Sequence, residues 1–468
     1  MSELETSEMA AAAAFVLPRV PRWRSLLRSF ALAKDPLPVL NDTLDRYGPT
    51  VELFIGGVEK SILTRDPGLT QHILQKNHRN YAKSKFTQGF SRYIGHGLLT
   101  NEGPDWLRQR RLIQPGFHRQ RVAGLTGLMQ EITAETLAPL EVQAAQHGGA
   151  TTVEAHELMT RLTFRIIARS VFSTNFPETE LDRLAGLITE IQAFFVRSIR
   201  QPYFKPWFRL RGRFRYHDDL AAELRRLLAA LIAQRQQANA QPGARPPDDL
   251  LQMLLDVRYE DTGEPMSPDR VLDEALILLV AGHETSANAL TWLTYLLAHH
   301  PAEAVAIQAE ATAVLGGRPP VFEDLPRLGK ALWAVQETMR RYPPAWMVDR
   351  VALADDAYQG LRIPKGTLFS LYFYGLHHDP GHWPEPAEFR PGRFAPGQPV
   401  QPFAYVPFGG GPRLCIGMQF ALTEMQLVTL ELLRRFDVEW VAGQPLVTMQ
   451  PLITLRPKHD FRVRLRLR

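Results

Sequence analysis

The sequence predicts a mainly α-helical fold with a small β portion, and three stretches carry this prediction. Residues 217–238 repeat leucine at helical spacing after acidic cap-like residues, which is typical of an amphipathic helix. A long helix is expected from Pro268 to His299; its middle, ALILLVAG, is apolar on all sides, so it should cross the interior. Residues 50–64 predict a β-hairpin, because two β-rich runs flank a pair of glycines.

From about residue 66 to 300 the pattern is mainly helical, and after about residue 345 it is mixed. Residues 239–249, with few apolar side chains, predict an exposed loop. We expect one domain over residues 1–468, with residues 1–40 as a surface-lying N-terminal segment. Beyond residue 345 the expected order is β-like runs (345–375), proline-rich coil (379–408), a helix (about 416–435) and C-terminal β-like runs.

Composition excludes several classes of protein. The apolar share of 45% is ordinary for a globular chain, so extensive disorder is not expected. The formal net charge is only +5 and no basic stripe or nucleic-acid module is present, which argues against nucleic-acid binding. The apolar run from Met9 to Leu17 is shorter than the about 20 residues that a membrane-spanning helix needs. A signal peptide has basic residues before its apolar run, whereas here the arginines follow it. These features predict a cytoplasmic protein without a transmembrane span.

Cys415 is the only cysteine, which excludes an intrachain disulfide and CxxC metal motifs. A lone cysteine is more often an inert buried residue than a functional one, so its surroundings must decide. It lies in Phe408-Gly-Gly-Gly-Pro-Arg-Leu-Cys-Ile-Gly417, directly before a predicted helix. A helix N-terminus and the nearby Arg413 favour a thiolate, and the glycines permit close approach of a flat group. No phosphate-binding frame fits, so the stretch predicts a metal-ligand loop.

The long helix contains Ala281-Gly-His-Glu-Thr285, an acid beside an alcohol in an apolar stretch. Burying an acid without purpose is costly. Threonine can bond back to the preceding turn and Gly282 weakens that turn, so a polar notch is expected. On these residues alone, a satisfied core threonine with Glu284 turned to solvent fits as well. His283 is not part of an HExxH zinc motif, because position 287 is alanine.

Two further patterns concern charged side chains. Glu337 and Arg340 lie three apart on a predicted helix whose neighbours are apolar, which indicates a buried pair. Trp106 is followed by Arg110 at helical spacing, and the arginine fork suits carboxylates.

Together these motifs resemble those of the cytochrome P450 family, in the family's order and over nearly the whole chain. The cysteine loop F-x-x-G-x-R-x-C-x-G is matched by Phe408, Gly411, Arg413, Cys415 and Gly417. The remaining matches are the acid–alcohol pair Glu284 and Thr285, the E-x-x-R pair Glu337 and Arg340, Arg393 in a sequence similar to F-x-P-x-R-F, and W-x-x-x-R at Trp106 and Arg110. Gly392 stands where the family more often has an acid.

The resemblance implies the cytochrome P450 fold, with haem b held between the long interior helix and the cysteine loop. It implies that Cys415 is the axial iron ligand, and that Trp106, Arg110, Arg350 and Arg413 meet the haem propionates. Thr285 and Glu284 match the pair implicated in oxygen activation and proton delivery. Glu337, Arg340 and Arg393 match a structural triad behind the haem.

The implied activity is insertion of one atom of O₂ into a lipophilic small molecule such as a fatty acid, terpenoid or steroid-like compound. Most such pockets are apolar, so the pocket residues leave the substrate open. Electrons must come from a separate ferredoxin or flavodoxin with an NAD(P)H-dependent reductase, which we expect to dock near Arg108, Arg111 and Arg119. The expected pocket residues are Phe194, Leu278, Ala281, Ala345, Trp346, Val348 and Leu452.

Other functions are weighed against this one. A peroxide-dependent relative is disfavoured by the acid–alcohol pair, as is a haem-binding sensor without turnover. A NAD-dependent dehydrogenase lacks its phosphate fingerprint. The segment 194–215 interleaves aromatic residues with seven basic ones. It suits a solvated or surface role first, then a membrane contact or an entrance that attracts a carboxylate.

Overall fold

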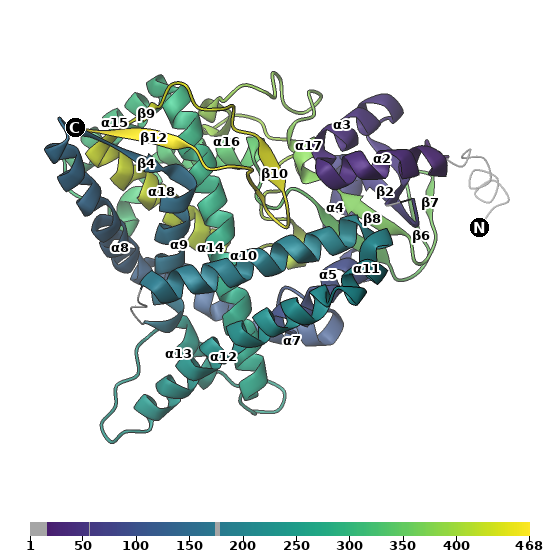
Figure 1. Cartoon of the computed structure of the whole chain (residues 1–468), viewed down its shortest axis with the longest axis horizontal. Coiled ribbons are helices and arrows are strands. Elements are labelled where there is room, and N and C mark those ends of the chain that lie inside the picture. Colours follow the sequence, from purple (N-terminus) through teal and green to yellow (C-terminus); the bar gives the residue numbers. More distant parts are fainter. Residues whose placement is uncertain (1–15, 56, 174–177) are drawn as a thin grey trace, which may run out of the picture.

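The computed structural model describes residues 16–55, 57–173 and 178–468. The apolar run predicted from Met9 therefore lies, up to residue 15, outside the described residues. The predicted long helix is confirmed as α14 (Pro268–His299), with Pro268 in its first turn and Ser267 as N-cap. It runs through the middle of the molecule (Figure 1), and most of its side chains are buried, as its all-round apolar centre predicts.

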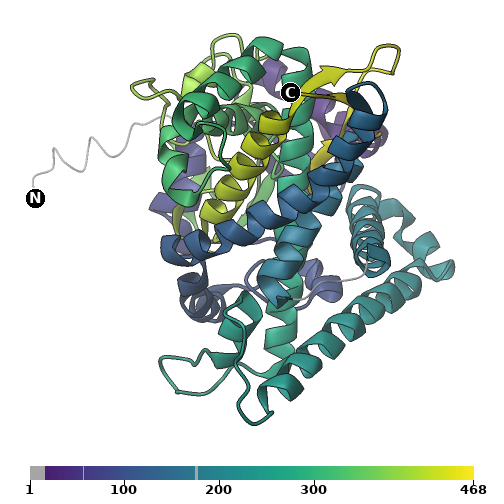
Figure 2. The same ribbon diagram turned by 90° about the vertical axis from the view of Figure 1, so that its left-hand side faces the viewer.

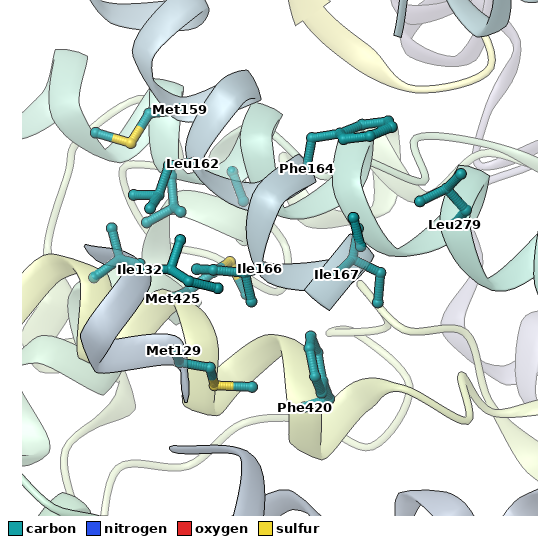
Figure 3. Packing of buried hydrophobic residues seen from close by; sticks show 14 of the residues in the cluster. Met129, Ile132, Met159, Leu162, Phe164, Ile166, Ile167, Leu279, Phe420 and Met425 are labelled. Carbon is teal, nitrogen blue, oxygen red and sulfur yellow. The ribbon is translucent and has the colours of Figure 1, made fainter. Parts of the chain in front are cut away.

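The main core lies where α14 meets α9 (Ala155–Phe172) and where α8 (Arg119–Gln146) meets α18 (Met418–Arg435). Figure 2 shows α8 in blue and α18 in yellow-green crossing side by side. Figure 3 shows apolar side chains filling the space between these helices. The labelled ones include Met129 and Ile132 of α8, Leu162 and Ile167 of α9, Leu279 of α14, and Phe420 and Met425 of α18. The helix predicted at about 416–435 is thereby confirmed.

A second helical layer is formed by α10 (Glu178–Arg200) and α12 (Arg213–Asn239), with the short α11 (Lys205–Leu210) between them. The helix predicted from residue 217 begins earlier, after Gly212, whose left-handed φ of 63° separates it from α11. The acidic residues therefore lie inside the first turns instead of at the cap. The predicted loop at 239–249 is confirmed, and Asp249 then caps α13 (Leu250–Asp256).

The predicted hairpin is confirmed as β1 (Thr50–Ile55) and β2 (Glu59–Thr64), with Thr50 opposite Thr64. It belongs to a five-stranded sheet in the order β1-β2-β8-β5-β3, where the others are β8 (Leu368–Leu371), β5 (Val348–Ala352) and β3 (Tyr81–Ala82). A three-stranded sheet joins β4 (Ala150–Glu154), β12 (Arg462–Leu467) and β9 (Phe436–Trp440). Two pairs complete the β portion: β6 (Asp356–Tyr358) with β7 (Leu361–Ile363), and β10 (Met449–Pro451) with β11 (Leu455–Pro457).

The remaining helices surround these layers. They are α2 (Arg22–Lys34), α3 (Pro36–Tyr47), α4 (Pro67–Gln71), α5 (Lys85–Gly89), α6 (Ser91–Ile94), α7 (Gly103–Ile113), α15 (Pro301–Leu315), α16 (Gly329–Arg341) and α17 (Phe373–His377), with the short turns η1 (His72–Lys76) and η7 (Gly411–Arg413). Among the residues searched, no helix is both long and apolar enough to cross a membrane.

Candidate functional site

The loop before α18 positions Cys415. The Cys415 amide donates to the Phe408 carbonyl at 3.0 Å, which closes the loop on itself. Gly411 has a φ of 65°, and a Cβ there would lie 1.9 Å from the carbonyl oxygen of Leu74 in η1. Any side chain would therefore clash with the backbone as well as strain it. Gly411 lets the loop close against η1 and fixes where Cys415 lies.

The Cys415 side chain is exposed, yet it lies deep enough that burial raises the pKa of its thiol. Exposed surface on a deeply placed atom means that the sulfur lines an interior space. The Gly417 amide and the Arg110 guanidinium act in the opposite direction and lower this pKa. The sequence predicts that Arg413 supplies the favourable charge, and this prediction is wrong, because Arg110 of the distant helix α7 supplies it. Arg413 is closer to Cys415 in the sequence, but its side chain points toward α7 and contacts Trp106.

Three predicted arginines gather around this space from different elements. Arg110 donates from Nη1 to the Leu414 carbonyl at 2.9 Å, directly beside Cys415. Arg413 lies 4.1 Å from the centre of the Trp106 ring and forms an ion pair with Glu102. Arg350 of β5 donates to the Asp349 carbonyl at 2.6 Å. The structure thus brings residues of α7, β5 and η7 together, as the sequence predicts.

For each of these arginines, burial lowers the pKa more than the neighbouring negative groups raise it. Burial lowers the pKa of Arg110 and Arg350, and it lowers that of Arg413 to about 10. Burial, aided by Arg413, also lowers the pKa of Lys83 to about 7. Lys83 donates to the Leu99 carbonyl at 2.5 Å. It lies in no motif, so the sequence did not predict its place in this cluster. Such a cluster fits a ligand with two carboxylates, and haem carries two.

On α14, Ala281 is exposed although it sits mid-helix between buried residues, so this helix also borders interior space. The polar notch expected here does not interrupt α14, which stays α-helical throughout. Gly282 serves packing instead, because a Cβ there would lie 2.8 Å from Ile167 of α9. The Thr285 hydroxyl donates to the Ala281 carbonyl at 2.9 Å.

Glu284 contacts the segment that joins the C-terminal strands β10 and β11. Its Oε1 accepts a 2.6 Å hydrogen bond from the Thr454 hydroxyl, which itself accepts from Asn288 at 3.0 Å. Arg456 of β11 lies close to Glu284. Burial lowers the pKa of Arg456, and the negative charge of Glu284 opposes this effect. The alternative with Glu284 in solvent is wrong, since this side chain is buried. Thr454 and Arg456 were missed because they are distant in sequence and carry no motif.

Comparison with known proteins identifies the family. The cytochrome P450 family model matches residues 18–463. This chain belongs to the cytochrome P450 family. It is 31% identical over 421 residues to the cyclooctat-9-en-7-ol 5-monooxygenase of Streptomyces melanosporofaciens, covering 89% of this chain and 88% of the relative. It is 29% identical over 423 residues to the chloroplastic carotene epsilon-monooxygenase of Arabidopsis thaliana, covering 86% and 77%.

Membership fixes the class of chemistry. The protein is a cytochrome P450 monooxygenase, an enzyme that uses O₂ and binds haem b through a cysteine thiolate. The predicted fold class is confirmed with it. The chain offers a single cysteine for that bond.

The P450 triad predicted from the sequence is assembled. Arg340 donates to both carboxylate oxygens of Glu337 at 2.7 and 2.8 Å, and neither side chain has exposed surface. Arg393 donates to Glu337 at 3.3 Å. Arg340 also bonds the carbonyls of His377 and Pro386, which ties α16 to the coil that leads toward the cysteine loop.

The predicted pocket residues are only partly assembled. The Trp346 indole donates to the Leu452 carbonyl at 2.9 Å, which joins two of the predicted stretches. Leu278 and Trp346 are buried, whereas Ala345, Val348 and Leu452 are half-buried. Phe194 stacks on His217 of α12 with ring centres 3.9 Å apart. This packing within the α10–α12 layer does not support its predicted pocket role.

Of the arginines expected to meet the electron donor, Arg108 is already engaged. It pairs with Asp261 at 2.8 Å and lies 3.7 Å above the Tyr259 ring. Arg111 and Arg119 are exposed.

Proposed function

We propose that this P450 inserts one oxygen atom of O₂ into a lipophilic small molecule, with Cys415 as the axial iron ligand and electrons from a separate donor. The observation that carries the proposal is the accessible yet deeply placed sulfur of the only cysteine, beside Arg110. The single-domain organisation over residues 1–468 and the cytoplasmic location stay predictions.

The haem would be held by residues of the cysteine loop, α7 and β5. Cys415 would bind the iron, and Phe408, Gly411 and Gly417 would shape the loop around it. The Gly417 amide and Arg110 stabilise the charged form of the sulfur. Trp106, Arg110, Arg350 and Arg413 would receive the propionates. When bound, haem supplies the iron that activates O₂, because thiolate ligation pushes electron density toward the metal and favours O–O cleavage.

The protein itself would hold and move protons on the α14 side. Thr285 donates its hydroxyl hydrogen to Ala281, which leaves the oxygen free to accept a hydrogen bond. Glu284 accepts the hydrogen bond of Thr454 and lies near Arg456. We assign Glu284 to proton delivery and Thr285 to hydrogen bonding at the oxygen site.

The substrate would lie against Ala281, Ala345, Val348 and Leu452. The names of two relatives refer to cyclooctat-9-en-7-ol and to carotene, and both compounds consist largely of hydrocarbon. Among fatty acids, terpenoids and steroid-like compounds, a terpenoid is therefore the first choice to test. The spin state of the ferric haem, followed while each class is titrated, would report which one binds.

Replacement of Cys415 tests the central assignment. Cys415→Ala should abolish the thiolate-type spectrum of the reduced, CO-bound protein, since no second cysteine can substitute. A retained spectrum would show that the assignment is wrong. Product formation with peroxide alone and none with a ferredoxin system would instead favour a peroxygenase. Spectra that respond to ligands without any oxidised product would favour a sensor.

The docking of an acidic ferredoxin or flavodoxin can be tested at two exposed arginines. Arg111→Glu and Arg119→Glu should slow reduction of the haem and flatten its salt dependence, because fewer charges then steer the encounter. Arg462→Glu on β12 is a matched exposed control. Unchanged reduction in both test variants would exclude this docking face.

The hydrogen-bonding role of Thr285 at the oxygen site has a matched neighbour as its control. Thr285→Ala should lower product formation by about 10²-fold, the lower end for loss of a group on which proton transfer depends. Ser286→Ala, one residue on but buried on another face, should leave it within about twofold. Equal losses in both variants would assign the effect to packing of α14.

A further inference from the structure

Arg200, the last residue of α10, is a cation that lies beside the residues expected to line the substrate pocket. Its Nη2 donates to the carbonyl of Pro451, at the end of β10, and its guanidinium lies 5.9 Å from the centre of the Trp346 ring. Pro451 directly precedes Leu452, and Trp346 directly follows Ala345. In Figure 1 the β10–β11 hairpin reaches toward α10. The fold therefore places a positive charge next to two stretches against which the substrate would lie.

The charge of Arg200 is not matched by a bonded acid. Within the described residues Arg200 forms no ion pair. Burial lowers the pKa of Arg200 to about 10, and the opposing charge of Asp35 does not offset this effect. Asp35 is the N-cap of α3 and accepts there from the Leu37 amide at 3.3 Å. A buried cation without a bonded counter-charge is costly, and an anionic ligand would remove that cost.

The Arg200 guanidinium also keeps donors free for such a ligand. An arginine carries several N–H donors, and among the described residues one hydrogen bond, to Pro451, uses them. No Arg200 nitrogen is both shut off from solvent and unbonded, so the unused donors face accessible space. The planar fork of these donors suits a carboxylate, which it can bind in a bidentate manner.

Arg197, one turn earlier on α10, shows what an ordinary surface arginine of this helix does. It is exposed, donates to Gln201 at 3.2 Å, and lies 5.3 Å from the centre of the Phe208 ring. Its contacts stay within the α10–α12 layer and do not include the β10–β11 hairpin. Of these two arginines, Arg200 is therefore the one that the fold directs toward the pocket.

We propose that Arg200 binds the carboxylate of a lipophilic acid whose hydrocarbon part lies against Ala345 and Leu452, and that such acids are the substrate class of this P450. The inference rests on the proposed function and deepens it. It also assigns one of the roles that the sequence leaves open for residues 194–215, an entrance that attracts a carboxylate. A phosphate would meet the same donors, but its second charge makes it costlier to bury beside a single cation.

Three probes that differ only in the head group test the proposal: farnesoic acid, its methyl ester and farnesol. The spin state of the ferric haem-loaded protein and isothermal titration calorimetry report binding of each near pH 7, where the acid is ionised. Farnesoic acid should bind about tenfold or more tightly than the ester or the alcohol, because it gains charged hydrogen bonds. Dodecanoic acid with its ester and alcohol repeats the comparison on a straight chain. Neither comparison requires a variant.

Variants then assign the preference to Arg200. Arg200→Gln can still donate to the Pro451 carbonyl but carries no charge. It should weaken binding of the acid by about tenfold or more and leave the ester and the alcohol within about twofold. Arg200→Lys keeps the charge and should keep most of the preference for the acid. Arg197→Gln, which removes an exposed cation of the same helix, is the matched control and should bind all probes like the original protein.

Asp35→Asn gives a test of opposite sign. Asparagine caps a helix as well as aspartate does, so α3 should keep its N-cap. The change removes the acidic charge that acts on Arg200. Farnesoic acid should therefore bind about twofold or more tightly than in the original protein, while the ester should be unaffected.

Four results would overturn the proposal. They are equal affinity for the acid and its ester, no response to either acid, tighter binding of farnesyl phosphate than of farnesoic acid, and an equal loss for all probes in Arg200→Gln. The last would assign Arg200 to packing of α10 against β10. Oxidation of farnesol without a preference for the acid would contradict this inference alone. Tight binding of the acid without any oxidised product would instead contradict the proposed function and leave the role of Arg200 standing.

Discussion

Two buried glutamates on neighbouring helices, Glu337 of α16 and Glu424 of α18, have no exposed surface and opposite surroundings. Glu337 accepts from Arg340, from Arg393 and from the Arg390 amide. The Ser286 hydroxyl lies beside Glu424, and no hydrogen bond of good geometry to either Glu424 oxygen occurs among the described residues.

The difference teaches that equal burial does not mean equal charge. Glu337 lies in a fully bonded ion cluster that ties α16 to the coil near residue 390. At Glu424, burial raises the pKa to about 8 against the lowering effect of Ser286, so the side chain is mostly neutral near pH 7. The first acid stabilises the fold through charge, and the second is tolerated because it carries none.

Removing the charge of Glu337 should have the largest effect. Glu337→Gln keeps the size but leaves Arg340 buried without a counter-charge, which costs about 3–5 kcal/mol. That is a large part of a typical folding free energy of about 5–15 kcal/mol. Urea unfolding followed by circular dichroism measures the loss. A cost no larger than that of Glu424→Gln would break the comparison.

Arg393→Ala should have an intermediate effect. Arg393 is the outer partner of Glu337, at 3.3 Å and partly exposed, while Arg340 would still neutralise the carboxylate. We expect a loss of about 1–3 kcal/mol, measured by the same urea unfolding. A loss equal to that of Glu337→Gln would mean that the three residues act as one unit.

The pH dependence of the stability of Glu424→Gln tests whether Glu424 is neutral in the folded protein. The folded-state pKa is raised from 4.5 to about 8, so the stability that depends on the bound proton is fully present below pH 4.5. It declines as the pH rises through that window and is lost above about 8. The variant should match the original protein within about 1 kcal/mol at low pH and be more stable at pH above 8. Melting temperatures across this range measure the difference, and parallel curves would contradict the raised pKa.

Ser286→Ala should give the smallest change. Ser286 lowers the pKa of Glu424, so its removal should raise that pKa and extend the decline of stability to higher pH, while the start of the decline near pH 4.5 stays in place. The shift is read from the same melting curves. A shift toward lower pH would show that Ser286 does not stabilise the charged form.

Sequence alone predicted much of the site because its parts carry local patterns. Cys415 with its glycines, the E-x-x-R pair and the apolar centre of α14 are each set by residues a few positions apart, where chain chemistry dictates spacing. The hairpin at 50–64 and the loop at 239–249 were likewise predictable, because turn and loop residues mark them.

Only the tertiary structure decided which distant groups meet. It places Arg110 instead of Arg413 beside Cys415, turns Glu284 toward Thr454, and packs Phe194 against His217. Within the described residues it also leaves both Glu424 oxygens without a hydrogen-bond partner, and it turns the Trp23, Leu27 and Phe30 side chains of α2 outward. Sequence periodicity shows that a helix has two faces, but which face is covered depends on neighbours brought close by folding. The sequence therefore determined the chemistry of the site, and packing determined the charge and partners of each group.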